Sequence, residues 1–369
     1  MSTPALAARI KASQWTASVT LGGAALWAIF AALAGLRRAP FSIVELLFLL
    51  ATLVIVPLGM ELERCLNDSR SSSLHTALRF TQPAASLAVC IAFWLPPGRT
   101  AAILGGAWLM ECLWLAGERV RRSRRDRAAT SLIVTLAYCD LIFGSAWLLI
   151  SRAGWRPMGF QEPIILLTAV HFHYSGFATA LIASATLGAF QRTKLAITGL
   201  QALVWLIALL PFAVAAGFVF SPLLRFVAAI ALSSAVTALA MVAWWFSSEL
   251  RSGTARIFLR LASCAAPVAF SLAGIYAVSE FFNRNWITIP GMANSHGVLN
   301  GIGFVLLSML AWLVELNESA SEPRRFVDDG RENARPVTPL SGLDRASSLR
   351  PRPHPLPIPE FVARDFYDR

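Results

Sequence analysis

Residues 164–190 read IILLTAVHFHYSGFATALIASATLGAF and carry no charged side chain. A helix needs about 20 predominantly apolar residues to cross a hydrocarbon core of about 30 Å, so this run is long enough to span a bilayer. Two further uncharged runs, at 195–224 and 285–314, are long enough as well. Because 56% of the 369 residues are hydrophobic and only 14% are charged, the composition predicts a helical membrane protein and excludes a soluble globular one.

The hydropathy pattern predicts an all-α, polytopic transmembrane bundle of about ten spans. The first span starts behind Arg9 and Lys11, and since no small-x-small cleavage motif clearly follows it, we expect it to be retained as a helix. Pro96-Pro97-Gly98 predicts a tight turn between the third and fourth spans. The predicted spans are 18–36, 41–60, 83–98, 100–117, 129–150, 163–190, 195–219, 222–247, 261–281 and 286–314.

Basic residues predict the orientation of these spans. The net charge of +11 does not indicate a nucleic-acid partner, because Lys and Arg fall in short loops and in the C-terminal tail, where the positive-inside rule places them. Attraction to anionic lipid headgroups is the simpler consequence. Arg and Lys are denser at the N-terminus and after the even-numbered spans, including a cluster from Arg119 to Arg127, than in the opposite loops. We therefore expect both termini in the cytoplasm.

Residues 316–369 differ in character from the rest of the chain. They are polar and rich in proline, and such a segment cannot bury enough apolar surface to fold alone. The sequence therefore predicts a transmembrane domain over 1–315 and a disordered cytoplasmic tail over 316–369.

Three of the five histidines fall in apolar runs, namely His171, His173 and His296. Polar side chains are costly in hydrocarbon, so intramembrane histidines are candidate functional residues. The helical rise places His171 about 13 Å from Glu162 and His296 about 15 Å from Trp286. These similar depths predict one polar site between the sixth and tenth spans.

Helix geometry divides the two histidines of the sixth span. Residues two apart point about 200° around an α-helix, so His171 and His173 face different partners. His171 shares its face with Tyr174 and Ser175. We expect Tyr174 and Ser175 to contribute to substrate binding.

On the last span, His296 lies one turn from Asn300, which is a further candidate for substrate binding. Gly297 and Gly301, four residues apart, allow a neighbouring helix to approach closely. The sequence thus predicts an imidazole and a carboxamide beside a close helix contact.

Two carboxylates, Glu111 and Asp140, lie near the middle of the fourth and fifth spans. A buried carboxylate without a partner is expected to be protonated, whereas one beside a histidine could exchange a proton with it. Both are therefore candidate partners of the histidines, with a structural hydrogen bond between helices as the alternative. Glu280 and Arg225 are expected at the membrane interface, where long side chains reach water.

The histidines have three alternative roles. They could make structural hydrogen bonds, or His171, His173 and His296 could hold a metal ion or haem, since neutral imidazole is the commonest metal ligand. They could instead bind substrate or relay protons. The H-x-H spacing lacks the H-E-x-x-H pattern of helical zinc sites, and the five cysteines show no C-x-x-C pair, which speaks against a disulfide framework or a Cys-type zinc site.

Two segments resemble a known family. The segment from Gly154-Trp155-Arg156-Pro157-Met158-Gly159-Phe160-Gln161-Glu162-Pro163 through Leu166-Leu167-Thr168-Ala169-Val170 into His171-Phe172-His173-Tyr174-Ser175-Gly176-Phe177 is similar to the first hallmark of the YndJ-like membrane proteins of bacteria. The segment His296-Gly297-x-x-Asn300-x-x-Gly303-Phe304 resembles their second hallmark. The resemblance is specific over about 155–177 and 294–304, and it implies a polytopic bacterial membrane protein of transporter-like character.

The leading hypothesis is a multi-pass, transporter-like protein of the bacterial inner membrane. His171, His173 and His296 would bind a small-molecule or lipid-soluble substrate or carry protons. The first alternative is a membrane-embedded enzyme acting on a lipid-soluble substrate, with the histidines as metal or haem ligands or as general acid and base. A second alternative is an immunity or sensory protein without turnover.

Overall fold

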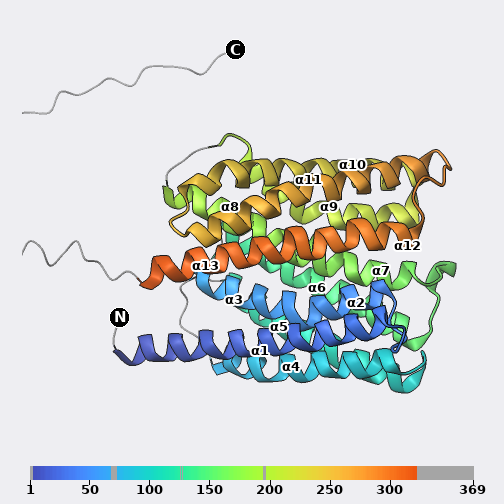
Figure 1. The fold of residues 1–369 in the computed structure, drawn as a ribbon, viewed down its shortest axis with the longest axis horizontal. Coiled ribbons are helices and arrows are strands. Elements are labelled where there is room, and N and C mark those ends of the chain that lie inside the picture. Colours follow the sequence, from blue (N-terminus) through green and yellow to red (C-terminus); the bar gives the residue numbers. More distant parts are fainter. Residues whose placement is uncertain (1–2, 68–72, 125, 127, 194–196, 322–369) are drawn as a thin grey trace, which may run out of the picture. The chain divides into compact units, whose positions relative to one another are not determined.

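The computed structural model describes residues 3–67, 73–124, 126, 128–193 and 197–321. Within these residues helices are the only regular elements, and they lie side by side (Figure 1). Unbroken helices are α1 (Thr3–Gly35), α4 (Ser73–Trp94), α5 (Arg99–Ser123), α6 (Ala129–Ala153), α9 (Leu200–Phe220), α10 (Pro222–Phe246) and α11 (Gly253–Phe281). Short 3₁₀ turns are η2 (Pro157–Gly159) and η4 (Ser247–Glu249).

Three membrane-length helices contain π-helical segments, whose wider turns bond residue i to i+5. The first consists of α2 (Ile43–Leu50), η1 (Ala51–Ile55) and α3 (Val56–Asn67). The second consists of α7 (Ile164–His171), η3 (Phe172–Ala178) and α8 (Thr179–Thr193). The third consists of α12 (Ile289–Met292), η5 (Ala293–Gly297), η6 (Leu299–Leu306) and α13 (Leu307–Ser321).

The predicted all-α membrane fold is confirmed. Nine helices of the described part are long and apolar enough to cross a membrane, and the tenth, α4, has a shorter apolar stretch over Phe80–Trp94. This short helix corresponds to the third predicted span. Helix α13 continues to Ser321, past the predicted start of the tail at 316, and the remaining tail residues lie outside the described part of the chain.

The α2–η1–α3 and α7–η3–α8 helices form the centre of the membrane domain, since most of their residues are buried. Helices α1 and α4 lie on one side of them, and α10 and α11 lie on the other (Figure 1). Side-chain donors bind carbonyls of the first central helix: Trp27 Nε1 donates to Leu46 O (2.7 Å) and Gln82 Nε2 donates to Thr52 O (2.8 Å). Such bonds join helices that hydrophobicity alone does not hold together in lipid.

Arg119 lies within α5 and is buried, although the sequence placed it in a loop cluster of basic residues. Its guanidinium donates to the carbonyl oxygen (2.8 Å) and hydroxyl oxygen (2.7 Å) of Ser131 in α6. It also lies 3.5 Å from a carboxylate oxygen of Glu63 in α3. A buried charge needs such partners. Arg119 therefore links three helices, in addition to contributing to the positive charge that sets the orientation of the spans.

Candidate functional site

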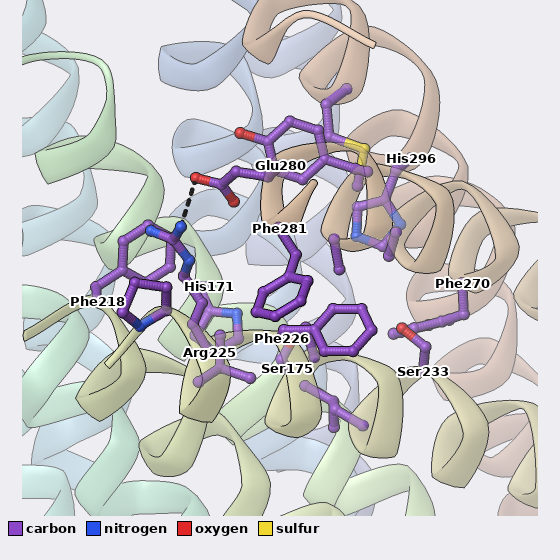
Figure 2. A pocket seen from close by; sticks show the side chains of 18 residues that line it. His171, Ser175, Phe218, Arg225, Phe226, Ser233, Phe270, Glu280, Phe281 and His296 are labelled. Atoms are coloured by element: carbon purple, nitrogen blue, oxygen red, sulfur yellow. Dashed lines mark ion pairs between the residues drawn. The ribbon is translucent and has the colours of Figure 1, made fainter. Parts of the chain in front are cut away.

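Two adjoining cavities, of about 200 and 240 Å³, lie between α7–η3, α9, α11 and α12–η5. The first cavity also reaches α10 (Figure 2). The residues that line both cavities are His171, Ser175, Val214, Phe218, Tyr276, Glu280, Met292 and His296. The structure therefore brings two of the three candidate histidines to one cavity.

His171 is the last residue of α7, and its ring binds a carbonyl of a neighbouring helix. The Nε2 atom lies 3.2 Å from Pro211 O in α9. A carbonyl oxygen only accepts hydrogen bonds, so His171 donates through Nε2–H. In the neutral imidazole the other nitrogen, Nδ1, is then an acceptor.

His296 lies in η5 and makes the corresponding bond to α11. Its Nδ1 lies 2.8 Å from Ala269 O, so Nδ1–H donates and Nε2 is the acceptor of the neutral ring. The Phe270 ring packs edge-on against this imidazole, with ring centroids 5.4 Å apart. Both cavity histidines thus have a fixed orientation and one nitrogen with capacity to accept a hydrogen bond or a proton.

The predicted meeting of the sixth and tenth spans occurs at Tyr174 and Gly301. A Cβ added at Gly301 would lie 3.1 Å from Cε1 of Tyr174, so the absence of a side chain lets the ring pack against η6. The Tyr174 hydroxyl donates to Leu47 O in α2 (2.9 Å). Tyr174 therefore joins three helices at the wall of the second cavity.

Asn300 lines the second cavity next to this contact. It is buried, and its Oδ1 atom has no hydrogen-bond partner within the described residues. Buried acceptors are rarely left unpaired in proteins. An unpaired amide oxygen at a cavity wall is therefore a candidate contact for a ligand.

His173 lies away from the cavity, on another face of η3. Trp108 Nε1 donates to His173 Nε2 (3.0 Å), and His173 Nδ1 donates to Ala169 O (2.8 Å). The ring is fully buried and packs edge-on against Phe48. Both ring nitrogens are engaged, so His173 acts here as a bridge between α5 and the central helix, and the predicted three-histidine site reduces to two histidines.

The two predicted carboxylates also lie elsewhere. Asp140 of α6 is fully buried against Gly176 of η3, where an added Cβ would be 2.6 Å from the Asp140 Cγ atom. Neither carboxylate oxygen has a hydrogen-bond partner among the described residues. Glu111 lines a separate pocket between α4 and α5, together with Thr81 and Trp114. Neither side chain lines the histidine cavity.

The described residues contain no group of three or more His, Cys, Asp or Glu side chains that could hold a metal ion. His171 and His296 are the two imidazoles at the cavity, and His173 is committed to Trp108 and Ala169. The residues present therefore do not fit the predicted three-histidine metal or haem site.

An ion pair at the cavity was not expected from the sequence. Arg225 Nη2 lies 3.0 Å from Glu280 Oε1 (Figure 2). The Arg225 guanidinium also lies over the Phe218 ring, 4.7 Å from its centroid. From the sequence, both charged residues were expected at the membrane interface. Their opposite charges near the same predicted membrane surface could have indicated the ion pair.

Comparisons with known proteins agree with the membrane fold. A family profile described as YndJ-like protein matches residues 46–304, which include the cavity residues from Leu47 to Asn300. A curated relative, the uncharacterized membrane protein YndJ of Bacillus subtilis (strain 168), is 28% identical over 186 residues. This match covers 50% of the chain and 33% of the relative, so the chain matches about a third of that protein. No solved structure matches the chain.

The family profile covers well over half of the chain, and the curated relative is itself a membrane protein. The two segments that resemble the family carry the histidines of the cavity. The chain therefore belongs to the YndJ-like family of multi-pass helical membrane proteins.

Proposed function

We propose that this protein is a transporter-like protein of the bacterial inner membrane, which binds a small molecule in the cavity between α7–η3, α9, α11 and η5. The observation that carries the proposal is the convergence of His171, His296 and the unpaired Asn300 amide oxygen on this mainly apolar space. A mainly apolar cavity with a few convergent polar groups is the usual form of a small-molecule site. A ligand donor group would bind the acceptor nitrogen of either imidazole.

The irregular helices support transport over catalysis. Two of the three helices with π segments supply cavity residues next to the irregular turns: His171 and Ser175 at η3, and His296 and Asn300 at η5 and η6. Departures from regular α-helix near the membrane midplane accompany the binding sites of many transporters, and π segments often mark functional sites. In contrast, the metal-dependent form of the enzyme alternative needs a third ligand beside the two histidines.

The two imidazoles also suit proton relay. Each has one nitrogen bonded to a backbone carbonyl, so a proton taken up at the other nitrogen leaves the ring orientation unchanged. Glu111 and Asp140 lie outside the cavity, so in this proposal neither exchanges protons directly with His171 or His296.

Access to the cavity from the two sides of the membrane tests the proposal. In a background without the native cysteines, Ala273→Cys places a thiol at the cavity, and Ile275→Cys places one on a more exposed position of the same helix that does not line it. The water-soluble cation methanethiosulfonate ethyltrimethylammonium is applied to right-side-out and to inside-out vesicles. We expect it to modify Cys at 273 in both preparations, because a transporter opens its site alternately to each side.

The Ile275→Cys variant should resist this reagent, because a lipid-facing thiol remains protonated and out of water. Modification of position 273 from the outer side alone would refute transport and leave a one-sided binding or enzymatic site. No modification of position 273 from either side would refute a cavity reached by water-soluble ligands.

A further inference from the structure

The Arg225–Glu280 pair marks one end of the first cavity, next to the turn between α9 and α10 and near the end of α11 (Figure 2). The side chains are partly exposed, Arg225 by 23% and Glu280 by 32%. Beyond the pair, the lining is mainly aromatic and aliphatic and includes Phe226, Phe270 and Phe281. The cavity therefore has a charged end and an apolar body.

Without its partner, each charged residue of this pair would interact unfavourably with the dipole of its own helix. Arg225 follows Pro222 by three residues at the start of α10, where the helix dipole favours negative charge, and Glu280 lies in the last turn of α11, where it favours positive charge. The ion pair offsets both costs. A ligand anion beside Arg225 would be supported by the positive end of the α10 dipole.

The contacts of Arg225 determine which partner is replaced. Its guanidinium stacks on Phe218, and its backbone packs closely against Gly217, where an added Cβ would overlap Arg225 N and Cα. Glu280 is the more exposed partner, and Arg225 is the cation paired with it among the described residues. The carboxylate can thus turn toward water while the guanidinium stays at the cavity. A guanidinium has five donors and binds carboxylate or phosphate through two of them.

We propose that the cavity binds a single-chain amphiphile with an anionic head, which replaces Glu280 as the partner of Arg225 while the apolar chain lies among Phe226, Phe270 and Phe281. The inference rests on the proposed ligand site and names its substrate class. Volumes of about 200 and 240 Å³ suit one chain rather than a two-chain phospholipid. His171 and His296 line the same cavity and would contact polar groups on the chain.

Equilibrium binding of radiolabelled dodecanoate to the purified full-length protein tests this inference. We expect Arg225→Gln to weaken binding at least ten-fold, because a charge-assisted pair is lost. Arg225→Lys should retain part of the affinity, and Glu280→Gln should tighten binding several-fold, because the competing carboxylate is gone. Arg121→Gln, which removes a charge from an ion pair with Glu118 away from the cavity, is the matched control and should bind as the parent does.

Unlabelled competitors separate the possible ligands. Dodecanol and dodecyltrimethylammonium should compete at least ten-fold more weakly than dodecanoate, and acetate should not compete, because it lacks the chain. Ala273→Trp fills the cavity and should abolish binding, which separates binding in the cavity from partition into detergent. Size-exclusion profiles matching that of the parent confirm that each variant is folded.

Three results would overturn the inference while leaving a ligand cavity in place. Equal competition by dodecanol, with Arg225→Gln unchanged, would mean that charge is not recognised. Binding of dodecyltrimethylammonium that Glu280→Gln abolishes would assign a cationic ligand. Competition by acetate as strong as that by dodecanoate would assign a small anion. The inference would be rejected if Ala273→Trp left dodecanoate binding intact, or if none of the probes bound. In either case, modification of position 273 from both sides of the membrane would show that the proposed transport function still holds.

Discussion

Replacing Gly144 with alanine should lower the free energy of unfolding by roughly 3 kcal/mol. The added Cβ would lie 2.5 Å from His173 Nδ1 and 3.0 Å from Ala169 O. The His173 ring has no room to withdraw, because it is fully buried and bonded to Trp108. Overpacking costs about 1–3 kcal/mol, and a buried imidazole nitrogen left without its partner costs a further 1–3 kcal/mol or so. Replacing a helical glycine returns about 0.5–1 kcal/mol.

Titration with sodium dodecyl sulfate in mixed micelles, followed by circular dichroism, measures this free energy. Gly106→Ala in α5 is the matched control, because its new Cβ meets only Leu149 Cδ1, at 3.9 Å, and should be neutral or slightly stabilising. Trp108→Phe, which removes the donor to His173, should cost less in the Gly144→Ala background than in the parent. The steric argument would be refuted if Gly144→Ala were as stable as Gly106→Ala, or if the free-energy costs of Gly144→Ala and Trp108→Phe were additive.

Reporter fusions after residues 37, 99, 156 and 284 should lie outside the cytoplasm and those after 70, 122, 193 and 253 inside it; a C-terminal fusion that reports from outside would exclude the ten-span orientation. Deleting residues 322–369 should leave membrane insertion and the thermal unfolding midpoint unchanged, and a lower midpoint would show that this segment stabilises the helices. Asp140→Asn should keep or raise the free energy of unfolding, because both carboxylate oxygens are buried without partners among the described residues. Asp140→Glu should lower this free energy by about 1–3 kcal/mol, because the longer side chain would press against Gly176. If Asp140→Asn were the less stable of the two variants, Asp140 would be charged and paired.

The sequence predicted the helices well because the bilayer limits the choice. An uncharged run such as 195–224 has to satisfy its backbone hydrogen bonds internally, and a helix does so. The regular rise of 1.5 Å per residue also allowed His171 and His296 to be matched in depth before their contacts were known. The two faces expected for His171 and His173 follow from the same geometry, and the structure has one at the cavity and the other against Trp108.

Contacts between helices could not be predicted in this way. The pairing of Asp140 with Gly176 depends on which helices are neighbours, and hydropathy carries no information on that. The pair formed by Arg225 and Glu280 was missed for a second reason. Each lies near the end of its span, where a charged residue is ordinary because it reaches water. Only the packing of α9, α10 and α11 shows that both border a cavity.

The π segment at Phe172–Ala178 makes the length of this stretch as important as its composition. A π turn holds about one residue more than an α turn, so losing one residue there would restore α-helix while the residues after it kept the faces that they present now. Thr179–Thr193 would keep its neighbours, whereas the side chains of the wide turn, among them the cavity residue Ser175, would change place. Among relatives, a one-residue gap within 172–178 or 293–306 would therefore preserve the packing of the helices and change only the cavity wall, even where both histidines are kept.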